Sequence, residues 1–192
     1  IAFVILCFSP LLAAAEKRIA LVIGNSNYSS SPLKNPVNDA TDMAIILKKL
    51  GFDVILKKNM THRPMEEAIR DFGNRLKSQK GVGLFFYAGH GLQANNMNYL
   101  IPISPNIEKE TDVQFEAVNV ERVLAEMANA DNGLNIVILD ACRDNPFRGL
   151  FRSSNRGLAV VSNAPTGTFI SYSTAANQVA RDGSGRNSPY TA

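Results

Sequence analysis

The sequence is poor in cysteine and contains no apolar run long enough to cross a bilayer. Its 192 residues include 2 cysteines, Cys7 and Cys142. Cys7 falls inside an apolar leader, so a chain that has lost this leader keeps Cys142 alone and cannot form an intramolecular disulfide. If the protein is exported, a lone thiol is a liability unless it is used, so Cys142 is a candidate reactive group.

Several patterns that mark other classes of protein are also missing. The net charge is only +3, and no cluster of lysine and arginine is interleaved with aromatic residues, which argues against nucleic acid as a partner. Paired cysteines and a His-x-x-x-His element are absent, so we expect no metal site. The segment Gly24–Tyr28 matches neither glycine-rich phosphate-binding pattern, which argues against a nucleotide-binding domain.

The segment Ile1–Ala15 has the composition of the apolar part of a secretory signal peptide. Three alanines precede Glu16, as at a small-residue cleavage site, so we expect cleavage after Ala15. The basic start of such a peptide is missing, and the segment is too short to span a bilayer. We expect a secreted or periplasmic protein with no stable membrane insertion after signal removal. The alternative is that this segment forms a buried first strand or helix.

Residues 16–192 alternate between continuous apolar runs and helical periodicity. Hydrophobic residues make up 45% of the chain and charged residues 19%, which indicates a globular domain. Strands that alternate with helices predict an α/β fold with a mainly parallel central sheet and helices on both faces. The expected strands are Arg18–Gly24, Phe52–Leu56, Val82–Ala88, Asn135–Leu139 and Thr168–Ser173, with a short extended piece at Tyr99–Ile103, and the expected helices are Pro36–Leu50, Thr61–Lys80 and Asn119–Ala130.

The end of the sequence has the pattern of a helix start. Ser188 is a favourable N-cap, and Pro189 suits the first helical position. Because this pattern stands only a few residues before Ala192, we expect the domain to continue beyond that residue.

Two of the apolar runs stop at reactive side chains. Phe85–Ala88 leads into His90, and Ile136–Leu139 leads into Cys142. Carboxyl ends of parallel strands meet at one edge of a sheet, where binding sites are built. Imidazole can accept a thiol proton near neutral pH. Alone, each residue could be a strand-end histidine or a buried structural thiol; together they predict a Cys/His nucleophilic enzyme.

These motifs resemble the caspase-like clan of cysteine peptidases. His90 stands about 50 residues before Cys142, which is the spacing of the caspase signature. The chain is most similar to the bacterial metacaspase-like branch, the orthocaspases, and this similarity implies a three-layer caspase-like fold. It extends over most of Lys17–Thr191 and includes Arg18–Asn27, Asn38–Ala40, Tyr87–Gly91 and Phe169–Thr174.

The resemblance implies roles for residues at the sheet edge. Cys142 would be the nucleophile, and His90 its base and later the acid for the departing amine. The backbone N–H groups of Gly91 and Cys142 would form the oxyanion hole. Protein or peptide substrates and no obligatory cofactor are implied. Calcium dependence stays open, because some metacaspases need calcium, and so does the oligomeric state.

Two positions depart from the animal caspase pattern. Asp140 replaces the glutamine two positions before the cysteine, and Asp144 replaces the glycine after Arg143. Animal caspases cut after aspartate, and an acid at position 140 would repel such a substrate. In metacaspase-like relatives an aspartate here and another on the first helix, matched by Asp39, line a pocket for arginine or lysine. The resemblance therefore implies cleavage after Arg, with Lys second; ordinary helix-start and strand-end acids are the alternatives.

A basic segment follows the expected nucleophile. Arg148, Arg152 and Arg156 lie in it and would be sites of self-cleavage in an arginine-specific peptidase. The alternative is an ordinary solvated loop. Cleavage there would not by itself indicate self-cleavage, since exposed loop tips are nicked readily by any protease. For the chain as a whole, the alternative to a peptidase is a catalytically silent caspase-like module that binds peptides or partners.

Overall fold

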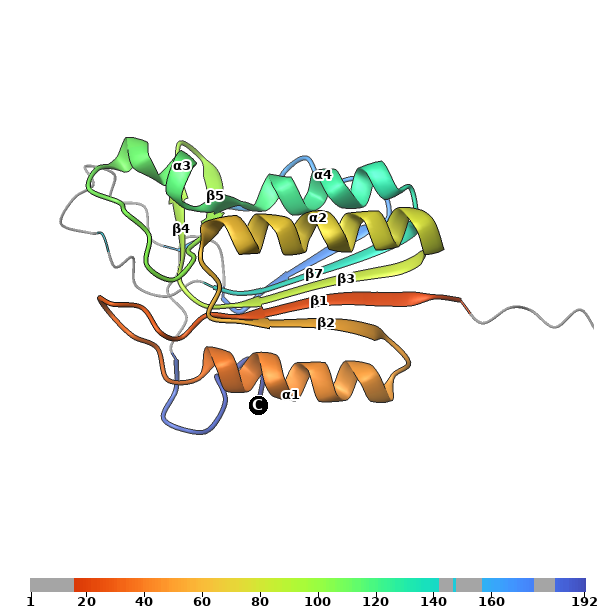
Figure 1. Cartoon of the computed structure of the whole chain (residues 1–192), viewed down its shortest axis with the longest axis horizontal. Coiled ribbons are helices and arrows are strands. Elements are labelled where there is room, and N and C mark those ends of the chain that lie inside the picture. Colours follow the sequence, from red (N-terminus) through yellow and green to blue (C-terminus); the bar gives the residue numbers. More distant parts are fainter. Residues whose placement is uncertain (1–15, 142–146, 148–156, 175–181) are drawn as a thin grey trace, which may run out of the picture.

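The central sheet of the computed structural model consists of parallel strands. The model describes residues 16–141, 147, 157–174 and 182–192, and within them the five strands of this sheet are ordered β2-β1-β3-β7-β8 (Figure 1). Every neighbouring pair is parallel, as predicted from the apolar runs. The strands are β1 (Arg18–Gly24), β2 (Asp53–Lys58), β3 (Gly81–Ala88), β7 (Gly133–Asp140) and β8 (Thr168–Tyr172).

Some of the predictions fall on residues outside the described part of the chain. These are the signal segment Ile1–Ala15, the thiol of Cys142 and the three arginines Arg148, Arg152 and Arg156. The described part of the candidate site consists of His90, Gly91, Asp39, Asp140 and their surroundings.

Helices cover both faces of the sheet, which confirms the expected three layers. Helix α1 (Pro36–Lys49) lies on one face, while α2 (His62–Gln79) and α4 (Val120–Ala130) lie side by side on the other (Figure 1). Parallel neighbours need such crossovers, because a short hairpin cannot return the chain to the same end of the sheet.

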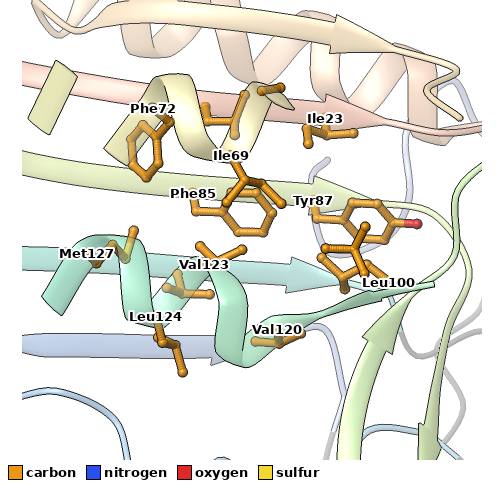
Figure 2. Packing of buried hydrophobic residues seen from close by; sticks show 14 of the residues in the cluster. Ile23, Ile69, Phe72, Phe85, Tyr87, Leu100, Val120, Val123, Leu124 and Met127 are labelled. Atoms are coloured by element: carbon orange, nitrogen blue, oxygen red, sulfur yellow. The ribbon is translucent and has the colours of Figure 1, made fainter. Parts of the chain in front are cut away.

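The sheet divides the hydrophobic core into two halves, one on each face. Successive side chains of a strand point alternately into one half and the other. In β1, Ile19, Leu21 and Ile23 face α2 and α4, whereas Ala20 and Val22 face α1. All five are fully buried, which explains why this strand has no polar positions between its ends. Figure 2 shows the larger half, where side chains of α2 and α4 pack on those of β3; its labelled members include Ile69, Phe72, Phe85, Tyr87, Val123 and Met127.

A small antiparallel sheet lies beyond the carboxyl ends of the central strands (Figure 1). It consists of β4 (Gly91–Ala94), β5 (Met97–Leu100) and β6 (Val118–Asn119). The expected extended piece at Tyr99–Ile103 is confirmed only in part, because β5 covers Met97–Leu100 and its partner β4 was not expected. Asn95 and Asn96 have φ values of 49° and 62°, so they form a tight hairpin turn between two short strands. The sequence pattern showed the polar turn but not the strand that precedes it.

Other boundaries shift by a few residues. Strand β2 starts one residue later than expected and continues to Lys58, because its main chain keeps pairing with β1 up to Gly24. Such pairing does not need apolar side chains, so the apolar run understated the strand. The 3₁₀ turn η1 (Glu110–Asp112) and the short helix α3 (Val113–Glu116) were not expected.

Truncating a core side chain of α2 tests the packing between helices and sheet. Phe72 is fully buried, whereas Phe115 is 68% exposed. We expect Phe72→Ala to lower the free energy of unfolding by about 3–5 kcal/mol, because it leaves a cavity. Phe115→Ala should change this energy by less than about 0.5 kcal/mol. Urea unfolding followed by circular dichroism measures both, and equal effects would contradict the core assignment.

Candidate active site

The strands that lead to His90 and Cys142 end at the same height of the sheet. Their register pairs Ala88 with Asp140, and the Gly89 N–H donates to the Asp140 carbonyl at 3.3 Å. His90 follows Ala88 by two residues, and Cys142 follows Asp140 by two residues. The prediction that both segments reach one edge is confirmed for the described residues. The thiol itself lies outside them.

Gly91 brings the histidine loop into contact with the residue before Cys142. A Cβ atom added at Gly91 would lie 2.6 Å from the Ala141 carbonyl oxygen and 3.1 Å from the Ala141 Cβ. Only glycine allows this approach without displacing backbone. The main chain of His90–Gly91 therefore packs directly on the main chain that continues into Cys142.

The imidazole of His90 is held by the loop after β1. His90 is 2% exposed, and its Nε2 lies 2.7 Å from the Ser31 carbonyl oxygen. A carbonyl can only accept, so Nε2 carries a proton, and whenever the ring is neutral its lone pair is on Nδ1. Ser31 has a φ of 59°, a backbone conformation that is uncommon for residues other than glycine and asparagine. No pattern in the sequence indicates this contact.

Two tyrosines fix the backbone of His90. The His90 N–H donates to the Tyr28 hydroxyl at 3.0 Å, and the Tyr28 hydroxyl lies 3.1 Å from the Ile101 carbonyl. The Tyr87 hydroxyl lies 2.9 Å from the His90 carbonyl and 2.8 Å from the Ile101 carbonyl. The Tyr28 ring also packs on the imidazole, with centroids 4.5 Å apart and planes tilted by 57°. Sequence reasoning missed both tyrosines, because neither stands in a catalytic pattern.

The two predicted pocket acids do lie close together. Asp39 is in the first turn of α1 and Asp140 ends β7, and both are fully buried. They share Ser188 as a partner: its N–H donates to Asp39 Oδ1 at 2.9 Å, and its hydroxyl donates to Asp140 Oδ2 at 2.5 Å. Neither side chain has exposed surface, so binding of a substrate cation to them requires a change of structure at this site.

The segment 182–192 lies along α1 (Figure 1). Arg186 donates from Nε and Nη2 to the two carboxylate oxygens of Asp42, each at 3.0 Å, and Asn187 donates to the same group at 3.0 Å. These hydrogen bonds, that of Arg186 first, hold the pKa of the Asp42 carboxyl below its ordinary value. The predicted helix start appears as one turn, in which the Thr191 and Ala192 N–H groups donate to the Ser188 carbonyl.

Among the described residues, no three His, Cys, Asp or Glu side chains gather as ligands for a metal ion. In the same part of the chain no helix is both long and apolar enough to cross a membrane.

The Tyr28 hydroxyl offers a test of this histidine support. We expect Tyr28→Phe to lower the free energy of unfolding by about 1–3 kcal/mol, because it leaves the buried His90 N–H without its acceptor. Tyr99→Phe is the matched control: both tyrosines are 6% exposed, but the Tyr99 hydroxyl contacts only the Met97 sulfur, at 3.9 Å, among the bonds described. Urea unfolding compares the two variants, and equal losses would show that the hydroxyl of Tyr28 has no special role.

Comparison with known proteins places these features in a family. The model of the caspase domain matches residues 17–192. Human mucosa-associated lymphoid tissue lymphoma translocation protein 1 is 34% identical over 132 residues, which cover 67% of this chain and 15% of that protein. Caspase a from Danio rerio is 34% identical over 135 residues, which cover 68% of this chain and 34% of that protein. The chain thus spans far less than two thirds of these relatives.

A solved structure supports the architecture independently. The protein GSU0716 from Geobacter sulfurreducens matches with a TM-score of 0.52 at 20% sequence identity, covering 67% of this chain and 52% of that chain. At this identity the likeness shows the fold alone. Because the family match extends over residues 17–192 and two relatives share about a third of the aligned residues, the chain belongs to the caspase-like cysteine peptidase family.

Proposed function

We propose that this chain is a cysteine endopeptidase in which Cys142 is the nucleophile and His90 its base. The observation that carries the proposal is the contact of Gly91 with Ala141 at the shared edge of β3 and β7. That contact brings the backbone of the histidine loop against the residue before the cysteine. The proposal is that the thiol of Cys142 and the imidazole of His90, carried on these two segments, act on one and the same peptide bond.

The reaction proceeds in two halves. His90 Nδ1 takes the proton of the Cys142 thiol, and the thiolate attacks the substrate carbonyl carbon to give a tetrahedral oxyanion. When the C–N bond breaks, the same nitrogen gives that proton to the departing amine, and a thioester remains on the sulfur. Water then attacks the thioester while Nδ1 accepts its proton. The carboxylic acid product leaves, and the proton returns to the sulfur.

Two backbone features would support this chemistry. The Ser31 carbonyl at 2.7 Å keeps the Nε2 proton in place and stabilises the imidazolium that forms after proton transfer. The N–H groups of Gly91 and Cys142 would donate to the oxyanion, a contribution that can reach about 3–4 kcal/mol per donor. Neither feature needs a side chain, so no third catalytic side chain is required.

We propose that the substrate residue before the cleaved bond is arginine, with lysine second. Asp39 and Asp140 are buried, acidic and bridged by one residue at the edge that carries His90. A guanidinium between two carboxylates makes charge-assisted hydrogen bonds that an ammonium group matches less well. With an arginine preference, Arg148, Arg152 and Arg156 become candidate self-cleavage sites. We further propose that the protein is an exported member of the orthocaspase branch.

The alternative function is a caspase-like module that binds peptides without cleaving them. Cleavage of a fluorogenic peptide ending in arginine distinguishes the two. We expect activity in the wild type, none above background in Cys142→Ala, and a loss of about a hundredfold or more in His90→Ala. His62, the second histidine of the chain, stands at the first position of α2, and His62→Ala is the control that should keep full activity. Equal rates in wild type and Cys142→Ala would favour the binding module.

The pocket acids are tested by their effect on substrate choice. We expect Asp39→Asn and Asp140→Asn each to lower kcat/KM for arginine peptides by at least about tenfold, because each removes one partner of a buried ion pair. Peptides with leucine at the same position should be affected far less. Asp71→Asn, at an exposed i,i+4 ion pair on α2, is the control. Full arginine preference in both pocket variants would refute the assignment.

A further inference from the structure

We infer that Ser188 is a positioning residue that sets the arginine selectivity of the acidic pocket by holding Asp39 and Asp140 in one fixed arrangement. This inference rests on the proposed function of the same site. It concerns a residue that no catalytic motif contains and that stands 149 positions after Asp39 and 48 after Asp140.

Ser188 uses its two donors on two different carboxylates. Its backbone N–H reaches Asp39 on α1, and its hydroxyl reaches Asp140 at the end of β7. Ser188 is as fully buried as the two acids. Buried carboxylates are costly unless each accepts hydrogen bonds, and two of them close together also repel each other. A donor bridge between them offsets both costs at once.

The direction of the hydroxyl proton is settled by a further contact. The Thr191 N–H donates to Ser188 Oγ at 3.2 Å, so this oxygen is already an acceptor on one side. Its single proton therefore goes to Asp140 Oδ2. The Thr191 hydroxyl approaches the same carboxylate oxygen at 3.4 Å, a longer and weaker contact. Ser188 is thus the principal donor to this carboxylate oxygen among the described contacts.

The bridge takes one oxygen from each acid. Ser188 contacts Asp39 Oδ1 and Asp140 Oδ2 and leaves Asp39 Oδ2 and Asp140 Oδ1 to other partners. A hydrogen bond to one oxygen of each carboxylate restricts rotation about its Cβ–Cγ bond and thereby limits where the second oxygen can lie. A guanidinium presents a planar fork of donors whose fit depends on such fixed acceptors. The bridge would thereby favour the fork of arginine over the point charge of lysine.

The position of Ser188 is itself held on both sides. Arg186 is anchored to Asp42 on α1 through two hydrogen bonds of 3.0 Å. On the other side, the Tyr190 hydroxyl bonds the Ser171 hydroxyl of β8. These anchors do not touch the pocket acids, so they can be altered separately from the bridge. This separation makes a role in selectivity distinguishable from a role in holding the segment.

The experiment compares Ser188→Ala with Asp42→Asn, using the full chain and fluorogenic peptides that end in arginine, lysine or leucine. We expect Ser188→Ala to raise KM for arginine by about tenfold, the size of a hydrogen bond to a charged group. For this variant kcat should stay within about twofold, the ratio of arginine to lysine cleavage should fall, and leucine cleavage should not change. Ser188→Thr keeps the hydroxyl and should restore arginine preference. Asp42→Asn weakens only one of the two anchors and leaves both donors of Ser188 in place, with the Tyr190–Ser171 contact still holding the segment, so it should resemble the wild type.

Four outcomes would overturn the inference. One is an equal loss of activity of Ser188→Ala on all three peptides, and another is a rise in KM for arginine peptides in Asp42→Asn as large as in Ser188→Ala. The third is a lower KM of Ser188→Ala for arginine peptides, which would mean that Ser188 competes with the substrate cation. If Ser188→Ala does not fold, Ser188→Cys replaces it, since a thiol is a weak donor of similar size. The fourth outcome, Cys142-dependent arginine cleavage with unchanged selectivity, would refute only the role of Ser188. A wild type that cleaves none of the peptides refutes the proposed function first.

Discussion

The parallel register between β3 and β7 is the constraint on which this site depends. It pairs Ala88 with Asp140, so β3 and β7 end side by side at one edge of the sheet. A slip of one position would turn the side chains of β7 to opposite faces of the sheet. The register resists such a slip because both faces are covered: Phe85 and Val137 are fully buried on the side of α2 and α4, and Phe86 on the side of α1.

At the carboxyl edge, buried polar groups are held by other parts of the protein. The backbone of His90 is tied to Tyr28 and Tyr87, and its ring to the Ser31 carbonyl. Hydrogen bonds in such a low-dielectric setting are costly to break singly, because each leaves a desolvated group behind. The loop after β1 and the end of β3 therefore form one connected support for His90, while Ser188 in the segment after β8 joins the first turn of α1 to the end of β7.

How far the sequence anticipates this arrangement depends on the range of each interaction. The apolar runs that end at His90 and Asp140 are local patterns, and they predicted the shared edge correctly. The pairing of Asp39 with Asp140 came from the family resemblance, because no local pattern joins a helix acid to a strand acid. Strand β4 was missed and β5 was predicted only in part, since each has only four residues and their turn has the composition of a polar loop.

The sequence by itself determined the alternation of buried strands with amphipathic helices and the reactive residues at the strand ends. Both follow from periodicity within a few turns or residue pairs. Only the tertiary structure decided that Ser188 bridges Asp39 and Asp140, and that Ser31 holds the imidazole of His90. These contacts join segments far apart in the chain through main-chain groups and a single hydroxyl, and such groups are present at nearly every position. Their role in the site depends on where the sheet and α1 bring them together, and not on the residue types themselves.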